Sequence, residues 1–186
     1  MKWLILPLLL TATLGSTQEL YQTKPATRDG IGKIYFGREI SHVMGHLGAG
    51  WLERPSREQE ERTDLLLNAL PLEPGDTVVD LGAGTGYFSF PIAQRLDVGE
   101  VLAVDIQQEM LDIIMARAAE SGIDNVQTVL ATPTSPGLGD AEVDLVLMVD
   151  AYHEFSHPAE VMAEVAQAWD LLVSNHILSL FCLVTH

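Results

Sequence analysis

The sequence has little of several features, and each scarcity excludes a class of protein. It has one cysteine, Cys182, so no disulfide can form within the chain. Lys and Arg number 10 against 26 Asp and Glu, which gives a formal net charge of −16. A surface that acidic repels phosphate backbones and anionic lipid headgroups, so nucleic acid is not expected as a partner. The serine elbow motif G-x-S-x-G is absent from the sequence, which argues against an α/β-hydrolase.

Long apolar runs are also scarce, because no segment after the first residues is apolar for long enough to span a membrane. The first residues, MKWLILPLLLTATLGSTQ, contain one lysine, then an apolar stretch, then small residues. This layout is typical of a secretory signal peptide. We therefore predict a signal peptide over residues 1–17, an exported protein (periplasmic or secreted), and no stable membrane span after cleavage. If this segment is not a signal, the expected location is the cytoplasm.

Residues 18–70 predict a polar linker followed by helices that lead into the main domain. The linker contains Pro25 and Gly30. A first helix is indicated by apolar residues at helical spacing, and a second by Ser56 as an N-cap with leucines on one side. The residues in question are Ile40, Val43, Met44 and Leu47 for the first helix and Leu65, Leu66 and Leu70 for the second.

Residues 71–186 alternate between short apolar runs and helical patterns. We predict strands at 77–81, 100–105, 126–130 and 143–149, with helices at 86–96, 109–121 and 158–169, and residues 177–184 as a candidate fifth strand. Strands that alternate with helices imply right-handed crossovers and a mostly parallel sheet with helices on both faces. The predicted fold class is therefore α/β and Rossmann-like.

The segment VVDLGAGTGYFS places Gly82, Gly84 and Gly86 in the turn after the first strand of this sheet. Glycine there permits positive φ and close approach of a ligand, and backbone N–H groups at the following helix start can bind a polar group. The spacing G-x-G-x-G differs from the G-x-G-x-x-G of dinucleotide folds. Asp80 would repel a pyrophosphate and favour a cationic ligand. A tight turn with a purely structural role is the alternative.

Asp105 ends the second strand, in VLAVDI. A carboxylate at this position can accept hydrogen bonds from both hydroxyls of a ribose. The alternative is that Asp105 caps the helix that begins near Gln107. Its distance from the glycine turn favours ribose binding.

Together the two motifs resemble the first two motifs of the class I S-adenosylmethionine-dependent methyltransferases. The likeness covers about residues 31–166, and YFGREISHVMGHLGAGWLERPSREQEER is similar to the lead-in helices of a group of small bacterial predicted methyltransferases. The resemblance implies S-adenosylmethionine as the cofactor and an enzyme that transfers its methyl group. It also implies site residues: Asp80, Gly82, Ala83, Gly84 and Gly86 around the amino acid moiety, Asp105 on the ribose, and Ile106 beside the adenine.

The sequence departs from the family pattern in two places. Many members have an acidic residue near the adenine after the third strand, where this chain has Ala131 and Thr132, so backbone contacts to adenine are expected there. The family also has a Pro-Gly-Gly turn, a long fifth strand and a closing hairpin, whereas this chain ends in WDLLVSNHILSLFCLVTH. We therefore expect the methyltransferase domain, residues 71–186, to lack its C-terminal strands.

The segment HEFSH permits two different interpretations. His153, Glu154 and His157 match H-E-x-x-H, which on a helix binds zinc with the glutamate as general base. Pro158 disfavours helical geometry at His157, and no third ligand follows. In a methyltransferase the same loop lies at the end of the fourth strand, near the methyl group. Asp150 would then contact the cofactor, His153 or Glu154 would act as base, and Tyr152 would pack on the acceptor; ordinary packing and loop roles are the alternative.

The sequence therefore predicts an S-adenosylmethionine-dependent methyltransferase that acts on a small molecule, with a protein acceptor as the second choice, and with no metal in its site. A zinc-dependent hydrolase is one alternative. A nicotinamide-dependent oxidoreductase is another, disfavoured by the glycine spacing and by Asp80. A non-catalytic cofactor-binding module is the third. The acceptor and the oligomeric state do not follow from the sequence.

Overall fold

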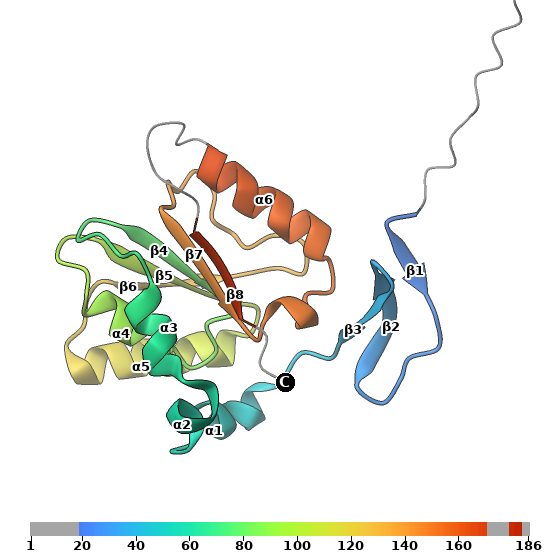
Figure 1. Cartoon of the computed structure of the whole chain (residues 1–186), viewed down its shortest axis with the longest axis horizontal. Helices are drawn as coiled ribbons and strands as arrows, with labels where there is room; N and C mark the ends of the chain where they lie inside the picture. The colour runs from blue at the N-terminus through green and yellow to red at the C-terminus, as the bar shows by residue number, and fades with distance from the viewer. Residues whose placement is uncertain (1–18, 171–178, 184–186) are drawn as a thin grey trace, which may run out of the picture.

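The computed structural model describes residues 19–170 and 179–183, which form two β-sheets and the helices around them (Figure 1). The predicted signal peptide, residues 1–17, lies outside the described residues. Among the helices that the structure describes, none is long and apolar enough to cross a membrane.

The larger sheet has five parallel strands in the order β6-β5-β4-β7-β8. The strands run over Thr77–Leu81 (β4), Glu100–Asp105 (β5), Val126–Leu130 (β6), Leu145–Val149 (β7) and Ser179–Leu183 (β8). In register, Val78 of β4 lies opposite Val101 on one side and Leu145 on the other, so β4 is the central strand. The predicted parallel sheet is confirmed, as is the candidate fifth strand, which pairs with β7.

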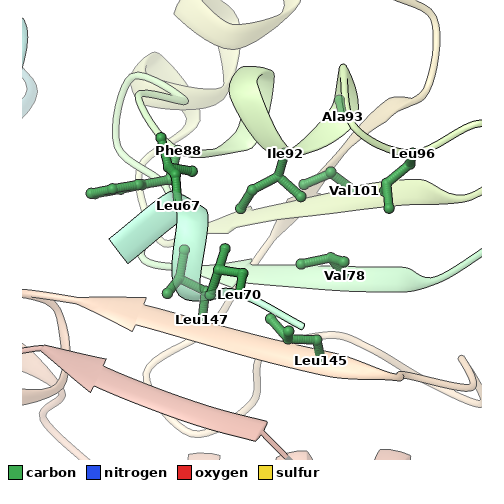
Figure 2. Packing of buried hydrophobic residues seen from close by; sticks show 10 residues of the cluster. All are labelled: Leu67, Leu70, Val78, Phe88, Ile92, Ala93, Leu96, Val101, Leu145 and Leu147. Atoms are coloured by element: carbon green, nitrogen blue, oxygen red, sulfur yellow. The ribbon is translucent and has the colours of Figure 1, made fainter. Parts of the chain in front are cut away.

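Helices cover both faces of this sheet, as predicted. Helices α3 (Thr63–Ala69), α4 (Ser89–Ala93) and α5 (Gln108–Ser121) pack on one face, and α6 (Pro158–Asp170) packs on the other (Figure 1). Figure 2 shows the buried cluster in which Leu67 of α3 and Leu70, directly after α3, pack over strand residues such as Val78. Such burial removes apolar surface from water and supplies the main driving force for folding. The sheet is therefore held rigidly from both sides, which fixes the positions of its strand ends.

The prediction of a helix over residues 40–47 is wrong. The prediction of an unstructured linker before it is wrong in part, because the linker contains a strand. Residues Tyr21–Thr23 (β1), Gly30–Tyr35 (β2) and Arg38–Ser41 (β3) instead form an antiparallel sheet. Burial alternates along β2, which is the period of a strand. Phe36 and Gly37 between β2 and β3 both have positive φ, 46° and 81°, which matches the favoured two-residue hairpin turns.

The second predicted helix, over residues 56–70, is divided into α2 (Arg57–Glu61) and α3. The division falls at Arg62, whose φ of 51° is left-handed. Ser56 precedes α2 as predicted, but its side chain makes no capping hydrogen bond. Leu67 and Leu70 face the core, whereas Leu65 is exposed, so the predicted apolar side is displaced. Before α2, the chain forms η1 (His46–Gly48) and α1 (Ala49–Leu52).

Candidate functional site

A cavity of about 430 Å³ lies at the carboxyl ends of β4, β5 and β7. Ligands of open α/β sheets bind at this edge, where the strand order reverses. Its walls come from the turns after these strands and from a segment that precedes α1, residues 42–48, which we call the strap. Nine of the predicted site residues line the cavity: Asp80, Gly82, Ala83, Gly84, Asp105, Ile106, Asp150, His153 and Glu154. Two predicted site residues, Gly86 and Tyr152, are not among the lining residues.

The glycine turn brings two strand ends into close contact. Gly82 has a φ of 82°, and a Cβ atom added to it would lie 2.3 Å from the Cβ of Ala151. Gly86 has a φ of 79°, and its added Cβ would lie 2.8 Å from the Phe90 ring. Gly82 therefore permits the turn after β4 to touch the end of β7 beside the cavity. Gly86 instead permits the turn to pack on α4, which is a structural role.

The backbone donors of this turn are already used inside the protein. The N–H groups of Gly82 and Ala83 both donate to the carbonyl oxygen of Val104, at 2.8 and 2.9 Å. The N–H group of Gly84 donates to Oδ2 of Asp105 at 2.9 Å. These three N–H groups of the turn are therefore engaged. Binding of a polar group by N–H groups at the start of the following helix stays a prediction.

Asp105 is buried at the end of β5 and connects two turns. Its Oδ2 accepts from Gly84, and its Oδ1 accepts from the backbone N–H of Gln107 at 2.9 Å. Burial raises the pKa of Asp105, and the hydrogen bonds from Gln107 and Gly84 oppose this rise. Asp105 does not cap α5, because the N-cap residue of that helix is Gln107 and the bond from its N–H closes a turn before the helix. Each carboxylate oxygen can still accept a second hydrogen bond, which leaves the capacity to hold two hydroxyl groups.

Asp80 supplies a second buried carboxyl group. Its Oδ2 accepts a hydrogen bond from the hydroxyl of Ser89, on the first residue of α4, at 2.6 Å. Burial raises the pKa of Asp80 to about 6, although the Ser89 hydroxyl favours the ionised form. Ser89 was missed by the sequence reasoning. Its only signal was its position at the end of the glycine motif.

The loop after β7 supplies the opposite wall. Asp150 has a left-handed φ of 53°, which is uncommon outside glycine and redirects the chain into η2 (Tyr152–Glu154). Glu154 is half-buried, and burial raises its pKa to about 7, with further contributions from the carboxylates of Asp105 and Asp150. Nε2 of His153 lies 3.8 Å from Oε1 of Glu154. The imidazole of His153 therefore shares this wall with the carboxyl group of Glu154, whose pKa is near neutral.

Tyr152 faces the hydrophobic core. Its ring packs against that of Phe155 with centroids 5.8 Å apart, and both rings contact the cluster beneath α6. The packing interpretation of Tyr152 thus fits its observed surroundings. The helix that a zinc motif needs is not formed, because η2 ends at Glu154 and Phe155 is extended. Within the described part of the chain, no three potential ligands lie close enough together to hold a metal ion.

Gln107 and Glu154 fix the strap across the cavity. The side-chain amide of Gln107 donates to the carbonyl oxygen of Met44 and accepts from the N–H of His46, both at 2.9 Å. Oε2 of Glu154 accepts from the N–H of Met44 at 3.1 Å. Sequence reasoning missed Gln107, although its place two residues after Asp105 was a usable signal. It also missed the strap, because the strap has no regular periodicity.

Arg57 lines the cavity and is 4% exposed. Its Nε donates to Oε2 of Glu61 at 2.9 Å, and its Nη1 donates to the carbonyl oxygen of Leu52 at 2.9 Å. The guanidinium group lies over the Tyr87 ring, 4.3 Å from its centroid. The Arg57 charge is thus matched by Glu61 within the protein. Arg57 was not singled out in the sequence.

Ala131 and Thr132 line the cavity after β6, where the adenine was expected. The N–H of Ala131 donates to the carbonyl oxygen of Asp105, and that of Thr132 donates to the carbonyl oxygen of Ser135, both at 2.8 Å. These two donors are therefore engaged. Contact of an adenine with the remaining backbone acceptors stays a prediction.

The fold and the site define a Rossmann-like domain for a nucleoside cofactor that carries positive charge. The parallel sheet places the glycine turn, the strand-end carboxylate of Asp105 and the buried carboxyl group of Asp80 around one cavity. The close approach at Gly82 lets the turn after β4 pack on Ala151, at the end of β7, which brings the two walls of the cavity together. These residues fit a cofactor with a ribose and a cationic amino acid moiety.

Comparison with known proteins identifies the family. Residues 78–171, about half of the chain, match the family model described as Methyltransferase domain. The chain therefore belongs to the class I S-adenosylmethionine-dependent methyltransferase family, and its cofactor is S-adenosylmethionine. It is similar to a SAM-dependent methyltransferase from Aquifex aeolicus, with a TM-score of 0.64, 26% identity and coverage of 68% of both chains.

Two curated relatives have different named acceptors. The chain is 33% identical over 82 residues to Nocamycin O-methyltransferase of Saccharothrix syringae, covering 44% of this chain and 29% of that protein. It is 31% identical over 114 residues to the 23S rRNA (uracil(1939)-C(5))-methyltransferase of Photobacterium angustum, covering 61% of this chain and 46% of that protein. The matched region thus spans less than half the length of these relatives.

Proposed function

We propose that this protein transfers a methyl group from S-adenosylmethionine to a small-molecule acceptor. The observation that carries the proposal is that one cavity contains both Asp105, placed to hold a ribose, and Glu154, whose pKa is about 7. The first carboxylate suits the cofactor. The second suits a proton acceptor, because a general base works best when its pKa lies near the operating pH.

The half of the cavity at β4 and β5 would hold the cofactor. Asp105 can accept hydrogen bonds from the two ribose hydroxyls, and Ile106 lies beside it with part of its side chain exposed to the cavity. Asp80 places negative charge near the glycine turn, where a cationic amino acid moiety would lie. When bound, S-adenosylmethionine supplies a methyl group already activated on a positively charged sulfur.

The half of the cavity at β7 would hold the acceptor. Glu154 can accept a proton at Oε1 while its Oε2 stays hydrogen-bonded to Met44. His153 adjoins Glu154 and can take part in the same proton transfer. The strap and the loop after β7 limit the acceptor's orientations, and such positioning can supply much of the rate enhancement of a group transfer.

Charge supports a small molecule over an RNA acceptor. The chain carries a net charge of −16, and Arg57 is the only Lys or Arg among the described residues that line the cavity. RNA binding depends on neutralising phosphates with Lys and Arg. The relative named for nocamycin accords with this proposal, and the relative named for ribosomal RNA represents the alternative.

We separately propose that the protein is exported. Residues 1–17 have the layout of a signal peptide, which supports export. An exported enzyme would need S-adenosylmethionine outside the cytoplasm. Fractionation of cells that express the full chain would test this, because cleavage after the signal and release into the exported fraction are both measurable.

The test of function is calorimetric titration of the full chain with S-adenosylmethionine, S-adenosylhomocysteine, NAD and zinc. We expect micromolar binding of the two adenosyl compounds and none of NAD or zinc. Asp105→Asn should weaken their binding by about tenfold or more, through the loss of one ribose acceptor. Asp112→Asn is the matched control, because it removes the same charge from an exposed site on α5. Binding of NAD alone, or equal binding by the Asp105 variant, would contradict the proposal.

A further inference from the structure

Exposed apolar side chains gather at the mouth of the cavity. Val43, Trp51 and Ile106 line the cavity and are 44%, 53% and 41% exposed. Each of the three is a large apolar side chain that solvent reaches. We call these three residues the apolar rim. Clustered exposed apolar residues beside a cavity are typical of a binding site, whereas single ones are ordinary.

The rim residues are held in place by neighbours. The guanidinium group of Arg54 lies 3.8 Å from the centroid of the Trp51 ring, and its Nη1 donates to the Trp51 carbonyl oxygen at 3.0 Å. Gln107 follows Ile106 and fixes the strap through Met44 and His46. The side chains of the rim are therefore already ordered, so binding a ligand on them would cost little conformational entropy.

Beneath the rim, the cavity carries an excess of negative charge. Among the described residues, four carboxyl groups and one Arg line it, and this Arg is already paired with Glu61 at 2.9 Å. S-adenosylmethionine carries two positive groups and one negative group, so it neutralises only part of this charge. Burial keeps the pKa of Asp80 and Glu154 near 6 and 7, so both can still ionise near neutral pH. The four carboxyl groups belong to Asp80, Asp105, Asp150 and Glu154.

We infer that the acceptor is an amine with an apolar body, which rests on the proposed function and names its substrate class. The apolar body lies on the rim, and the nitrogen lies near Glu154 and Asp150. The remaining negative charge attracts an ammonium group, repels a carboxylate, and gives a neutral alcohol no comparable advantage. Charge complementarity and apolar contact thus select the same kind of molecule.

The chemistry of the step agrees with this charge. The ammonium first gives a proton to the Glu154 carboxylate, which leaves a lone pair on nitrogen. That lone pair forms the new N–CH₃ bond as the S–CH₃ bond breaks, and the bonding electrons pass to sulfur, which becomes a neutral thioether. The positive charge therefore moves from sulfur to nitrogen. Glu154 holds the proton at this stage, so the carboxylate of Asp150 is the fixed negative charge on the wall where the positive charge arises, and fixed opposite charge there lowers the barrier.

The first experiment compares three head groups on the same apolar bodies. Phenylbutyl, indolylethyl and decyl compounds, each as amine, alcohol and carboxylate, are titrated calorimetrically into the full chain saturated with S-adenosylhomocysteine. We expect at least one amine to bind about tenfold or more tightly than its matched alcohol, with weaker binding of the carboxylate. Methyl transfer to that amine from labelled S-adenosylmethionine should follow. An alcohol or a carboxylate that binds as tightly as its amine across the series would overturn the inference.

The second experiment uses a matched pair of variants. Val43→Ser removes part of the rim, whereas Val98→Ser makes the same change at an exposed site, 84% exposed, that does not line the cavity. Val43→Ser should lower amine affinity by about fivefold and more than it lowers affinity for S-adenosylhomocysteine, while Val98→Ser should change neither. Equal effects of the two variants on amine affinity would exclude the rim. Failure of the unmodified chain to bind S-adenosylhomocysteine would instead refute the proposed function.

Discussion

Oε2 of Glu154 accepts a hydrogen bond from the backbone N–H of Met44 at 3.1 Å, across 110 residues of sequence. This contact connects the loop after β7 to the strap. It places a half-buried carboxyl group between two walls of the cavity, which is why burial raises the pKa of Glu154 to about 7. The stability of the fold should therefore depend on pH through this side chain.

Glu154→Gln should remove part of that pH dependence. The pKa of Glu154 rises from an ordinary 4.5 to about 7 on folding, so the folded state keeps a proton that the unfolded chain has lost. The free energy of unfolding should therefore fall as the pH rises from about 4.5 to about 7, by on the order of 3 kcal/mol. The variant should show a smaller fall, measured by urea unfolding at pH 5 and pH 8. Asp80 contributes equally to both proteins, so parallel pH profiles would contradict the assignment to Glu154.

Gly82→Ala should destabilise the fold more than Gly37→Ala. The two glycines have almost equal φ values, 82° and 81°, so the backbone cost of about 1 kcal/mol is shared. A Cβ at residue 82 would lie 2.3 Å from the Cβ of Ala151, whereas one at residue 37 meets nothing within 4 Å. We expect a further loss of about 1–3 kcal/mol at residue 82, seen by denaturant unfolding. Equal losses would show that the contact with Ala151 adjusts freely.

Arg57→Met should be strongly destabilising because it leaves Glu61 buried. The side chains of this pair are both 5% exposed, and breaking such a pair costs about 3–5 kcal/mol. Arg54 also contacts Glu61, at 2.6 Å, and should moderate the loss. Arg62→Met is the control, because its pair with Asp64 is largely exposed and worth less than about 1 kcal/mol. Thermal unfolding that ranks the two variants equally would be inconsistent with the observed burial.

Ser89→Ala should raise the pKa of Asp80 above about 6 by removing its hydroxyl donor. The loss of stability should be about 1–3 kcal/mol at pH 8, where Asp80 is ionised, and smaller at pH 5, where it is protonated. Ser121→Ala is the matched control, since Ser121 is exposed and bonds only to carbonyl oxygens of its own helix. A Ser89 loss that is independent of pH would indicate a packing effect.

The parallel sheet was predictable because its strands are buried apolar runs with clear ends. The predicted bounds of β4, β5 and β6 agree with the structure, and Gly122 ends α5 with a φ of 69°, as its position indicated. Asp80, Gly82 and Asp105 could be placed at the cavity because the carboxyl ends of parallel strands meet at one edge. Local sequence pattern therefore determined the half of the site at β4 and β5.

The remaining elements depend on contacts that no local pattern reveals. Ile40 and Met44 have helical spacing, yet Ile40 is a strand residue and Met44 is held by Gln107 and Glu154. Likewise, no sequence pattern marks Glu61 as buried, yet its partner Arg57 stacks on Tyr87 and the pair is buried. Such long-range contacts override helical propensity. They also placed Tyr152 in the core.

The residues that line the cavity come from two segments of the chain. The cofactor half lies within residues 78–171, which match the family model, whereas Val43, Met44, Trp51, Leu52 and Arg57 lie before the matched region. We therefore expect a change in the earlier segment to alter the choice of acceptor more than the binding of the methyl donor. Related chains that differ in the strap should then share a cofactor while methylating different acceptors.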